Sequence, residues 1–194
     1  MDYDKLILVI YEYQNLNLGG LRQKANHVLL SLCEKIEQLP LESQNSLLSR
    51  LLTEIYDSDS LDFLKQRGNG QLPFPLKQLL SHWLLPRCER HSMPDMRWFY
   101  QVFLYDNEYA EIAHQYLQKA FEYYPKDKKV SELVFEKNIE TLEFGIHEFP
   151  IGFCITDEDA NLCIKQCDEI VSLGFISNEL LNRYLDVKKC YHKD

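Results

Sequence analysis

The sequence is short of the residues and runs that mark an unusual class of protein. Only 7 glycines and 7 prolines occur among its 194 residues, which excludes a collagen-like or low-complexity chain. The first apolar run, from Leu6 to Tyr11, is too short for a membrane span or a secretory signal. The hydrophobic fraction of 45% is nevertheless sufficient for an ordinary folded core. We therefore expect a cytoplasmic globular protein that does not enter a membrane.

Patterns of catalytic and cofactor-binding residues are also missing. Gly19-Gly20 and residues 68–70 lack the further glycine and lysine of a phosphate-binding loop. No serine or cysteine has the neighbours of a nucleophile elbow. We predict no catalytic residue and no cofactor, which favours a protein other than an enzyme.

The six cysteines are scattered through a chain that is large enough to fold without disulfide bonds. We predict reduced and mostly buried thiols. Cys163 and Cys167 lie one helical turn apart and, with Cys190 and His192, offer a set of zinc ligands. Closed zinc sites usually place their cysteine pairs in loops, whereas these two lie on an apolar helix stripe, so we prefer core thiols.

The net charge of −9 is concentrated in the second half of the chain. Residues 1–97 carry 12 acidic and 11 basic side chains, whereas residues 98–194 carry 18 and 10, so the halves net −1 and −8. An acidic surface repels the phosphates of nucleic acid. We therefore exclude nucleic acid as a partner and expect either a basic protein partner or acidity that serves solubility alone.

Apolar residues recur at helical spacing along most of the chain. Segments with this spacing are 21–39, 47–55, 61–65, 76–84, 95–104, 108–124 and 128–148. The first two should pair antiparallel, and the helix at 76–84 should stop at Pro86. The run from Leu6 to Tyr11 has the composition of a strand or a helix, and we favour a helix.

Two further helices are indicated by residues typical of helix ends. Thr156 and Asp159 resemble a capping box, Gly174 suits the position after a helix C-terminus, and Ser177 suits an N-cap. Residues 149–155, before them, read as extended or loop-like. The predicted fold is all-α, an irregular helical bundle or array of about seven to eight helices. We predict a single domain over residues 1–194, with a possible subdomain boundary near residues 68–75.

The helix pair at residues 94–127 has a small, a large and a small residue and then a proline in its second helix, at Ala113, Leu117, Ala120 and Pro125. This pattern resembles the second helix of a tetratricopeptide repeat. Leu104 matches a large residue of the first helix, whereas Gln101 stands where the family has glycine, and no second copy follows. The resemblance implies a protein-binding hairpin, and a generic helical hairpin is the alternative.

The helix at 128–148 carries a stripe that we call the acidic ridge. It consists of Glu132, Glu136, Glu140, Glu143 and, at its end, His147. Spacings of three and four residues confine these side chains to about 80° of the helix surface. Like charges at such spacings oppose helix formation by about 0.2–0.5 kcal/mol per pair. The ridge is therefore either a solvated face or a docking surface for a basic protein.

We predict a helical domain that binds a basic protein through the acidic ridge, as an inhibitor or an adaptor. In size and acidity the chain is similar in general type to bacterial immunity proteins, without a shared motif. The alternative is a metal-dependent helical-bundle enzyme, because Glu111 and His114 form the Glu-x-x-His tetrad of di-iron bundles. No second tetrad occurs, so we predict no metal site. The oligomeric state is left open.

Overall fold

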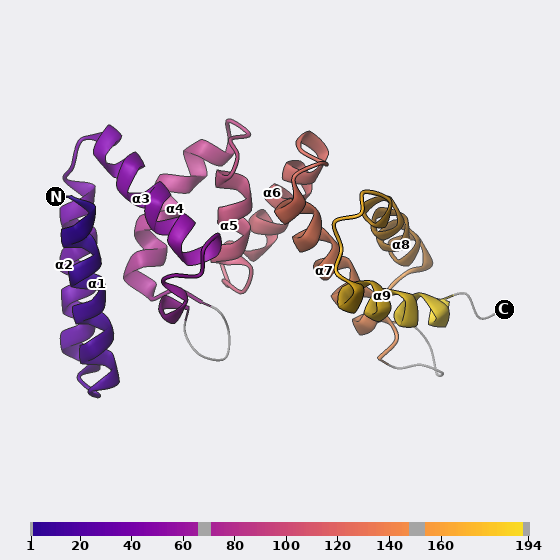
Figure 1. The fold of residues 1–194 in the computed structure, drawn as a ribbon, viewed down its shortest axis with the longest axis horizontal. Helices are drawn as coiled ribbons and strands as arrows, with labels where there is room; N and C mark the ends of the chain where they lie inside the picture. The colour runs from indigo at the N-terminus through magenta and orange to yellow at the C-terminus, as the bar shows by residue number, and fades with distance from the viewer. Residues whose placement is uncertain (1, 66–70, 148–153, 192–194) are drawn as a thin grey trace. The chain divides into compact units, whose positions relative to one another are not determined.

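The protein is all-helical over the residues that the computed structural model describes, which are 2–65, 71–147 and 154–191 (Figure 1). These ranges contain nine α-helices, one 3-10 helix and no strand. The helices are α1 (Tyr3–Leu18), α2 (Arg22–Glu37), α3 (Leu41–Tyr56), η1 (Asp62–Leu64), α4 (Phe74–Cys88), α5 (Asp95–Phe103), α6 (Ala110–Tyr123), α7 (Lys128–Gly145), α8 (Asp157–Ser172) and α9 (Asn178–Tyr191). The all-α prediction is confirmed, and the preferred helical interpretation of Leu6 to Tyr11 is correct.

The chain forms two compact units, Met1–Tyr116 and Leu117–Asp194. The division lies within α6 and not near residues 68–75, where the sequence places a possible subdomain boundary. Residues 66–70 and 148–153 lie outside the described ranges, and the second of these gaps takes in most of the predicted loop at 149–155. The number of independently folding domains stays a prediction.

Helices α1 and α2 form an antiparallel hairpin at the start of the first unit (Figure 1). Gly20 lies in the turn with φ of 76°, a left-handed conformation that glycine adopts without steric cost. The short turn returns the chain directly along α1, and Leu6, Ile10 and Leu29 are buried between the helices and their neighbours. The predicted pairing of 21–39 with 47–55 is therefore wrong, because α2 packs mainly against α1 and α4.

Helix α4 continues past Pro86 to Cys88, so the predicted stop at this proline is also wrong. Proline removes one backbone donor and therefore one helical hydrogen bond. Pro86 lies in the last turn of α4, so only one hydrogen bond near the helix end is lost. The helix continues beyond it, and Glu89 N donates to Leu85 O at 3.1 Å. The apolar positions assigned to the core are buried as expected; they are Leu76, Leu79, Leu80, Trp83 and Leu84.

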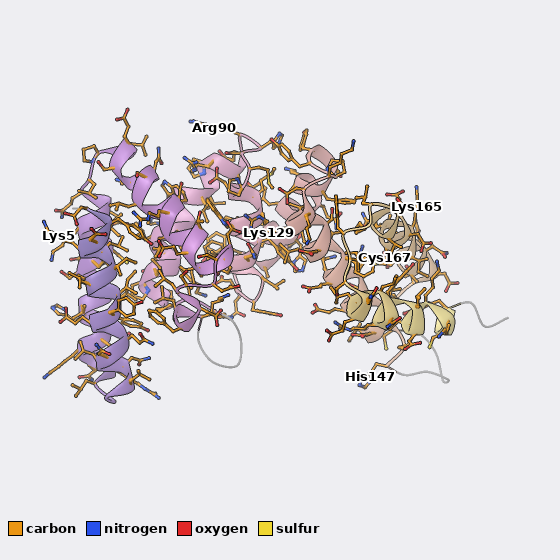
Figure 2. The ribbon with its side chains drawn as sticks, viewed as in Figure 1. Lys5, Arg90, Lys129, His147, Lys165 and Cys167 are labelled. Carbon is orange, nitrogen blue, oxygen red and sulfur yellow. The ribbon has the colours of Figure 1, made fainter. Side chains whose placement is uncertain are left out.

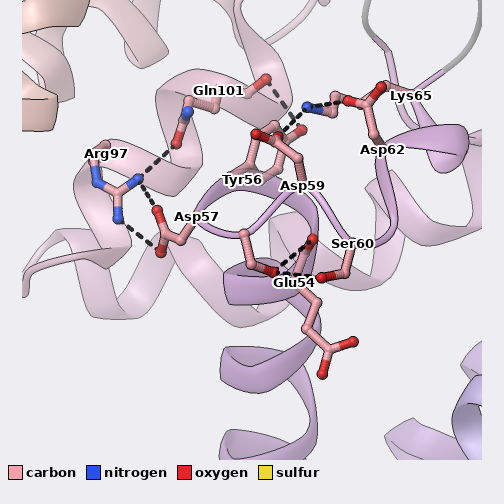
Figure 3. A network of polar contacts seen from close by, with 10 residues as sticks. Glu54, Tyr56, Asp57, Asp59, Ser60, Asp62, Lys65, Arg97 and Gln101 are labelled. Carbon is pink, nitrogen blue, oxygen red and sulfur yellow. Dashed lines mark hydrogen bonds and ion pairs between the residues drawn. The ribbon is translucent and has the colours of Figure 1, made fainter.

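Helix α5 lies in the core of the first unit and carries two buried charges. The Arg97 side chain is buried and donates to both carboxylate oxygens of Asp57 at 2.7 and 3.1 Å (Figure 3). Asp95, also buried, forms an ion pair with Arg87 of α4, with 3.0 Å between Oδ1 and Nε. These pairs connect α5 to the C-terminal ends of α3 and α4. Gln101 accepts a further hydrogen bond from Arg97 at 3.2 Å.

The helix ends predicted in the second unit are confirmed. Asp159 N donates to Thr156 Oγ1 at 3.1 Å at the start of α8, and Leu180 N donates to Ser177 Oγ at 3.3 Å at the start of α9. Gly174, with φ of 73°, follows the C-terminus of α8.

The C-terminal end of α7 is closely packed at Gly145. A Cβ atom built on Gly145 would lie 2.1 Å from the Tyr191 hydroxyl and 2.7 Å from a side-chain carbon of Ile155. The Tyr191 hydroxyl donates to Leu142 O at 2.7 Å, and Cys154 N donates to Gly145 O at 2.8 Å. The absence of a side chain at this position therefore lets the end of α9 approach α7.

Replacing Arg97 with methionine should strongly destabilise the first unit. The change keeps much of the side-chain volume but removes the two hydrogen bonds from the guanidinium to Asp57, and because the Asp57 side chain is only partly buried, the free energy of unfolding should fall by about 1–3 kcal/mol. Urea unfolding followed by circular dichroism measures this change.

The matched control is Arg90→Met, since Arg90 is exposed just beyond the end of α4 (Figure 2). This change should alter the free energy of unfolding by less than about 0.5 kcal/mol. Equal unfolding curves for the two variants would show that the Arg97 pair is not a stabilising contact.

Candidate functional site

The acidic ridge lies on α7, beside the face that packs against α8 and α9. Asp127 begins the helix by accepting a hydrogen bond from Val130 N at 3.0 Å, so α7 starts at the predicted residue. Val134, Phe135 and Leu142 are buried on the packed face. The helix ends at Gly145, three residues before the predicted end, and Glu148 lies outside the described residues.

The four carboxylates of the ridge differ in exposure. Glu136 and Glu140 are exposed, whereas Glu132 and Glu143 are half-buried. His147 follows the last turn of α7 and is exposed, with its side chain directed away from the helices of the second unit (Figure 2). Helical spacing therefore brings the four glutamates together as predicted, while the histidine lies beyond the helix.

Both ends of the acidic ridge have cationic partners. At the N-terminal end, Lys128 lies 3.7 Å from Glu132. At the C-terminal end, the guanidinium of Arg183 from α9 binds both carboxylate oxygens of Glu143, with Nε donating to Oε1 at 2.6 Å and Nη2 to Oε2. This hydrogen bonding, with the attraction of the two charges, lowers the pKa of the Glu143 carboxyl.

Arg183 is a residue of the site that sequence reasoning missed. It lies forty residues beyond Glu143 in the chain, and helical periodicity relates only residues on the same helix. The sequence offers no signal for this contact, because the burial of its neighbour Tyr184 and the packing of α9 against α7 exist only in the folded chain.

The centre of the acidic ridge has no ion pair among the described residues. Glu136 and Glu140 stand one turn apart between the two neutralised ends. Partial desolvation, followed by repulsion from Glu140 and Glu132, raises the pKa of the Glu136 carboxyl. One turn further along this surface, the Phe144 ring is 62% exposed. The centre of the ridge therefore combines two exposed negative charges with an exposed aromatic ring.

The helix pair that resembles a tetratricopeptide repeat consists of α5 and α6. Ala113, Leu117 and Ala120 are completely buried, as the small and large positions of that pattern require. The first helix has only nine residues, and Leu104 lies at its end, half-buried. The resemblance stays a prediction.

The metal-enzyme alternative gains no support from the surroundings of His114. Its Nδ1 lies 2.7 Å from Ala110 O on the same helix, and its ring packs edge-on against Tyr100 with 5.4 Å between the ring centres. Glu111 is exposed. Within the described ranges, no three His, Cys, Asp or Glu side chains are placed to hold a metal ion.

The cysteines are free thiols, and Cys33, Cys88, Cys163 and Cys167 are buried. Burial raises the pKa of the Cys167 thiol to about 12 and raises that of Cys163 as well. Their burial agrees with core thiols at both positions. His192, the fourth residue of the zinc alternative, lies outside the described residues.

No described helix is both long enough and apolar enough to cross a membrane.

No protein-family model, curated protein or solved structure matches the chain.

Replacing Glu143 with glutamine should destabilise the protein at neutral pH. The folded-state pKa of Glu143 lies below its unfolded value, so ionisation stabilises the fold above the unfolded pKa, near 4.3, and that stabilisation disappears as the pH falls through the folded pKa. The pair is partly exposed, so the difference at pH 7 should be at most about 1 kcal/mol. Urea unfolding at pH 7, 5 and 3 tests this, and a difference that grows toward pH 3 would contradict it.

Replacing Glu136 with glutamine should have the opposite effect. Its folded-state pKa is raised, so ionisation of Glu136 opposes folding at neutral pH. The variant should be more stable than the wild type at pH 7 by a few tenths of a kcal/mol, and the gain should vanish below the unfolded pKa. Thermal unfolding at pH 7 and pH 3 measures it; a loss of stability at pH 7 would show that Glu136 has a stabilising partner.

Proposed function

We propose that the chain is a protein-binding domain that engages a basic protein through the acidic ridge of α7, with Glu136 and Glu140 as its main contacts. The proposal rests on one observation, which is that ion pairs within the described ranges neutralise the carboxylates at the two ends of the ridge but not those at its centre. Its ends are paired within the chain, by Lys128 and Arg183, while two carboxylates at its centre stay exposed and unpaired among the described residues.

A cationic partner would relieve the repulsion at this centre. Like charges one turn apart destabilise the isolated helix, and after partial desolvation the same repulsion contributes to the raised pKa of Glu136. A lysine or arginine placed between Glu136 and Glu140 would convert that repulsion into attraction. Part of the binding free energy would then come from removing an unfavourable interaction already present in the free protein.

The exposed ring of Phe144 gives the same surface an apolar contact. Aromatic residues contribute disproportionately to binding when a partner covers them, and surrounding charges mainly set the association rate and the choice of partner. Phe144 and Glu140 are one turn apart and lie on the same side of α7. The proposed surface therefore provides both an apolar anchor and charges that steer the partner.

The function has two narrower forms, an immunity-type inhibitor of a cationic toxin and an adaptor. The acidity and size of the chain are compatible with both. A toxin gene beside the gene for this chain would favour the inhibitor, and rescue of cells that express that toxin would test it directly.

Reversing the two central charges should abolish partner binding. Tagged wild-type protein and the variant Glu136→Lys plus Glu140→Lys are used to capture partners from lysate of the source organism, and captured proteins are identified by mass spectrometry. A basic protein retained by the wild type should be missing from the variant. Calorimetry with that purified protein should show at least a hundredfold weaker binding, since reversal of interfacial charges typically changes the binding free energy by several kcal/mol.

The control is Glu122→Lys plus Glu169→Lys, which changes the net charge by the same amount. Both residues are exposed in the second unit, one on α6 and the other on α8, near the C-terminal ends of their helices where lysine is tolerated. This variant should bind within about threefold of the wild type. If both double variants weakened binding equally, the effect would be due to net charge and not to the acidic ridge, which would contradict the proposal. Capture of acidic proteins alone would also overturn it.

A further inference from the structure

A groove runs along the surface of the α1–α2 hairpin in the first unit. One part is a hollow of about 600 Å³ between the helices, with Val9, Val28 and Leu32 among its lining residues. A second hollow of about 440 Å³ shares Val28 with the first and extends to Leu16. Because the two share lining residues, they form one continuous depression, which we call the hairpin groove. From Lys5 to Leu16 it follows α1 for about 16 Å at the rise of an α-helix.

The hairpin groove leaves apolar side chains uncovered. Leu8 stands at its edge and is 69% exposed, although leucine is usually buried in folded proteins. Val9, Leu16 and Val28 are only half-buried. Helix α1 therefore presents apolar residues on two sides, one packed within the unit and the other facing the groove. A third helix laid in the groove would cover the second side.

The charged residues lining the hairpin groove are mostly basic. They are Lys5, Lys24, Lys35 and the single acid Glu12. Lys5 projects outward from the hairpin (Figure 2) and has an exposed partner, Asp2, at 3.5 Å. Lys24 and Lys35 have no ion pair among the described residues. In a chain of net charge −9, this is a local excess of positive charge beside an apolar surface.

We propose that the hairpin groove binds an amphipathic helix of a partner protein, one whose apolar stripe is flanked by glutamate or aspartate residues. Helix-in-groove recognition needs an apolar floor for the stripe and complementary charges at its edges. The floor is provided by Val9 and Val28 and the α2 edge by Lys24 and Lys35, whereas the α1 edge carries Lys5 and Glu12. This surface has the opposite charge preference to the acidic ridge and belongs to the other unit, so it does not depend on the proposed function.

Two other occupants fit the charges less well. A second copy of the chain, docked by two-fold symmetry, would set the same lysine-rich surface against itself. A lipid layer would take the Glu12 carboxylate, which lines both hollows, into an apolar environment that disfavours its charge. An acidic helix can place the carboxylates of one flank along α2, where they face Lys24 and Lys35, while its apolar stripe covers the valines and its other flank lies near Lys5 and Glu12.

Two synthetic peptides test the proposal on the full chain. Both are fluorescein-labelled helices of about 18 residues, long enough to match α1, and share one leucine stripe. They differ only beside that stripe, which glutamate flanks in one peptide and lysine in the other. Fluorescence anisotropy should show that the wild type binds the glutamate peptide at least tenfold more tightly than the lysine peptide. The double variant Lys24→Glu plus Lys35→Glu should reverse this preference.

Leu8→Glu should weaken binding of the glutamate peptide at least tenfold without unfolding the chain, because Leu8 is exposed. Its matched control is Leu41→Glu on α3, at a leucine that is 67% exposed and does not line the groove, and this variant should bind as the wild type does. Circular dichroism checks that both variants stay folded.

Equal affinity for the two peptides, or equal effects of the two leucine variants, would overturn the proposal. So would a concentration-dependent dimer in sedimentation that Leu8→Glu dissociates, since the occupant would then be a second copy. Cosedimentation with vesicles of three parts phosphatidylcholine to one part phosphatidylserine, lost in Leu8→Glu, would assign the groove to lipid instead.

Discussion

The ion pair between Arg97 and Asp57 constrains how the end of α3 packs against α5 in the first unit. A buried guanidinium is tolerated only where its donors are met, and here a bidentate carboxylate and the Gln101 side chain meet most of them. The pair constrains the orientation of α5 relative to the end of α3 because two hydrogen bonds join a planar guanidinium to a planar carboxylate. With Asp95 and Arg87 at the other side of the helix, α5 is positioned by charge as well as by apolar packing.

Charge has the opposite role on α7. The ion pairs of α5 hold helices together, whereas Glu136 and Glu140 are exposed side chains on one helix and repel each other. Both roles occur at Arg183. It holds α9 against α7 through its ion pair with Glu143, and among the described residues it forms no ion pair with the neighbouring exposed carboxylates. A protein that only needed α7 to be stable would gain from glutamine at position 136. The proposed partner gives a reason for keeping the charge.

Much of the local structure could be predicted from the sequence, because helix formation depends on near neighbours. The apolar spacing of α7 and the caps at Thr156 and Ser177 are short-range signals, and the structure confirms them. The mistakes concern packing between helices. Nothing in the spacing of α2 and α3 shows that α1 takes the place beside α2, and α1 itself had no clear amphipathic pattern because both of its sides are apolar.

The same limit applies to the candidate site. The four glutamates could be found from helical periodicity alone, but Arg183 could not, since its distance from Glu143 along the chain carries no information about contact in space. The hairpin groove was also beyond prediction, because it exists only where two helices meet. Gly145 belongs with these features, since its lack of a side chain matters only once Tyr191 lies against it. Any larger residue at position 145 would have to displace Tyr191 or Ile155, so mutation is far more restricted at this codon than at codons for exposed residues.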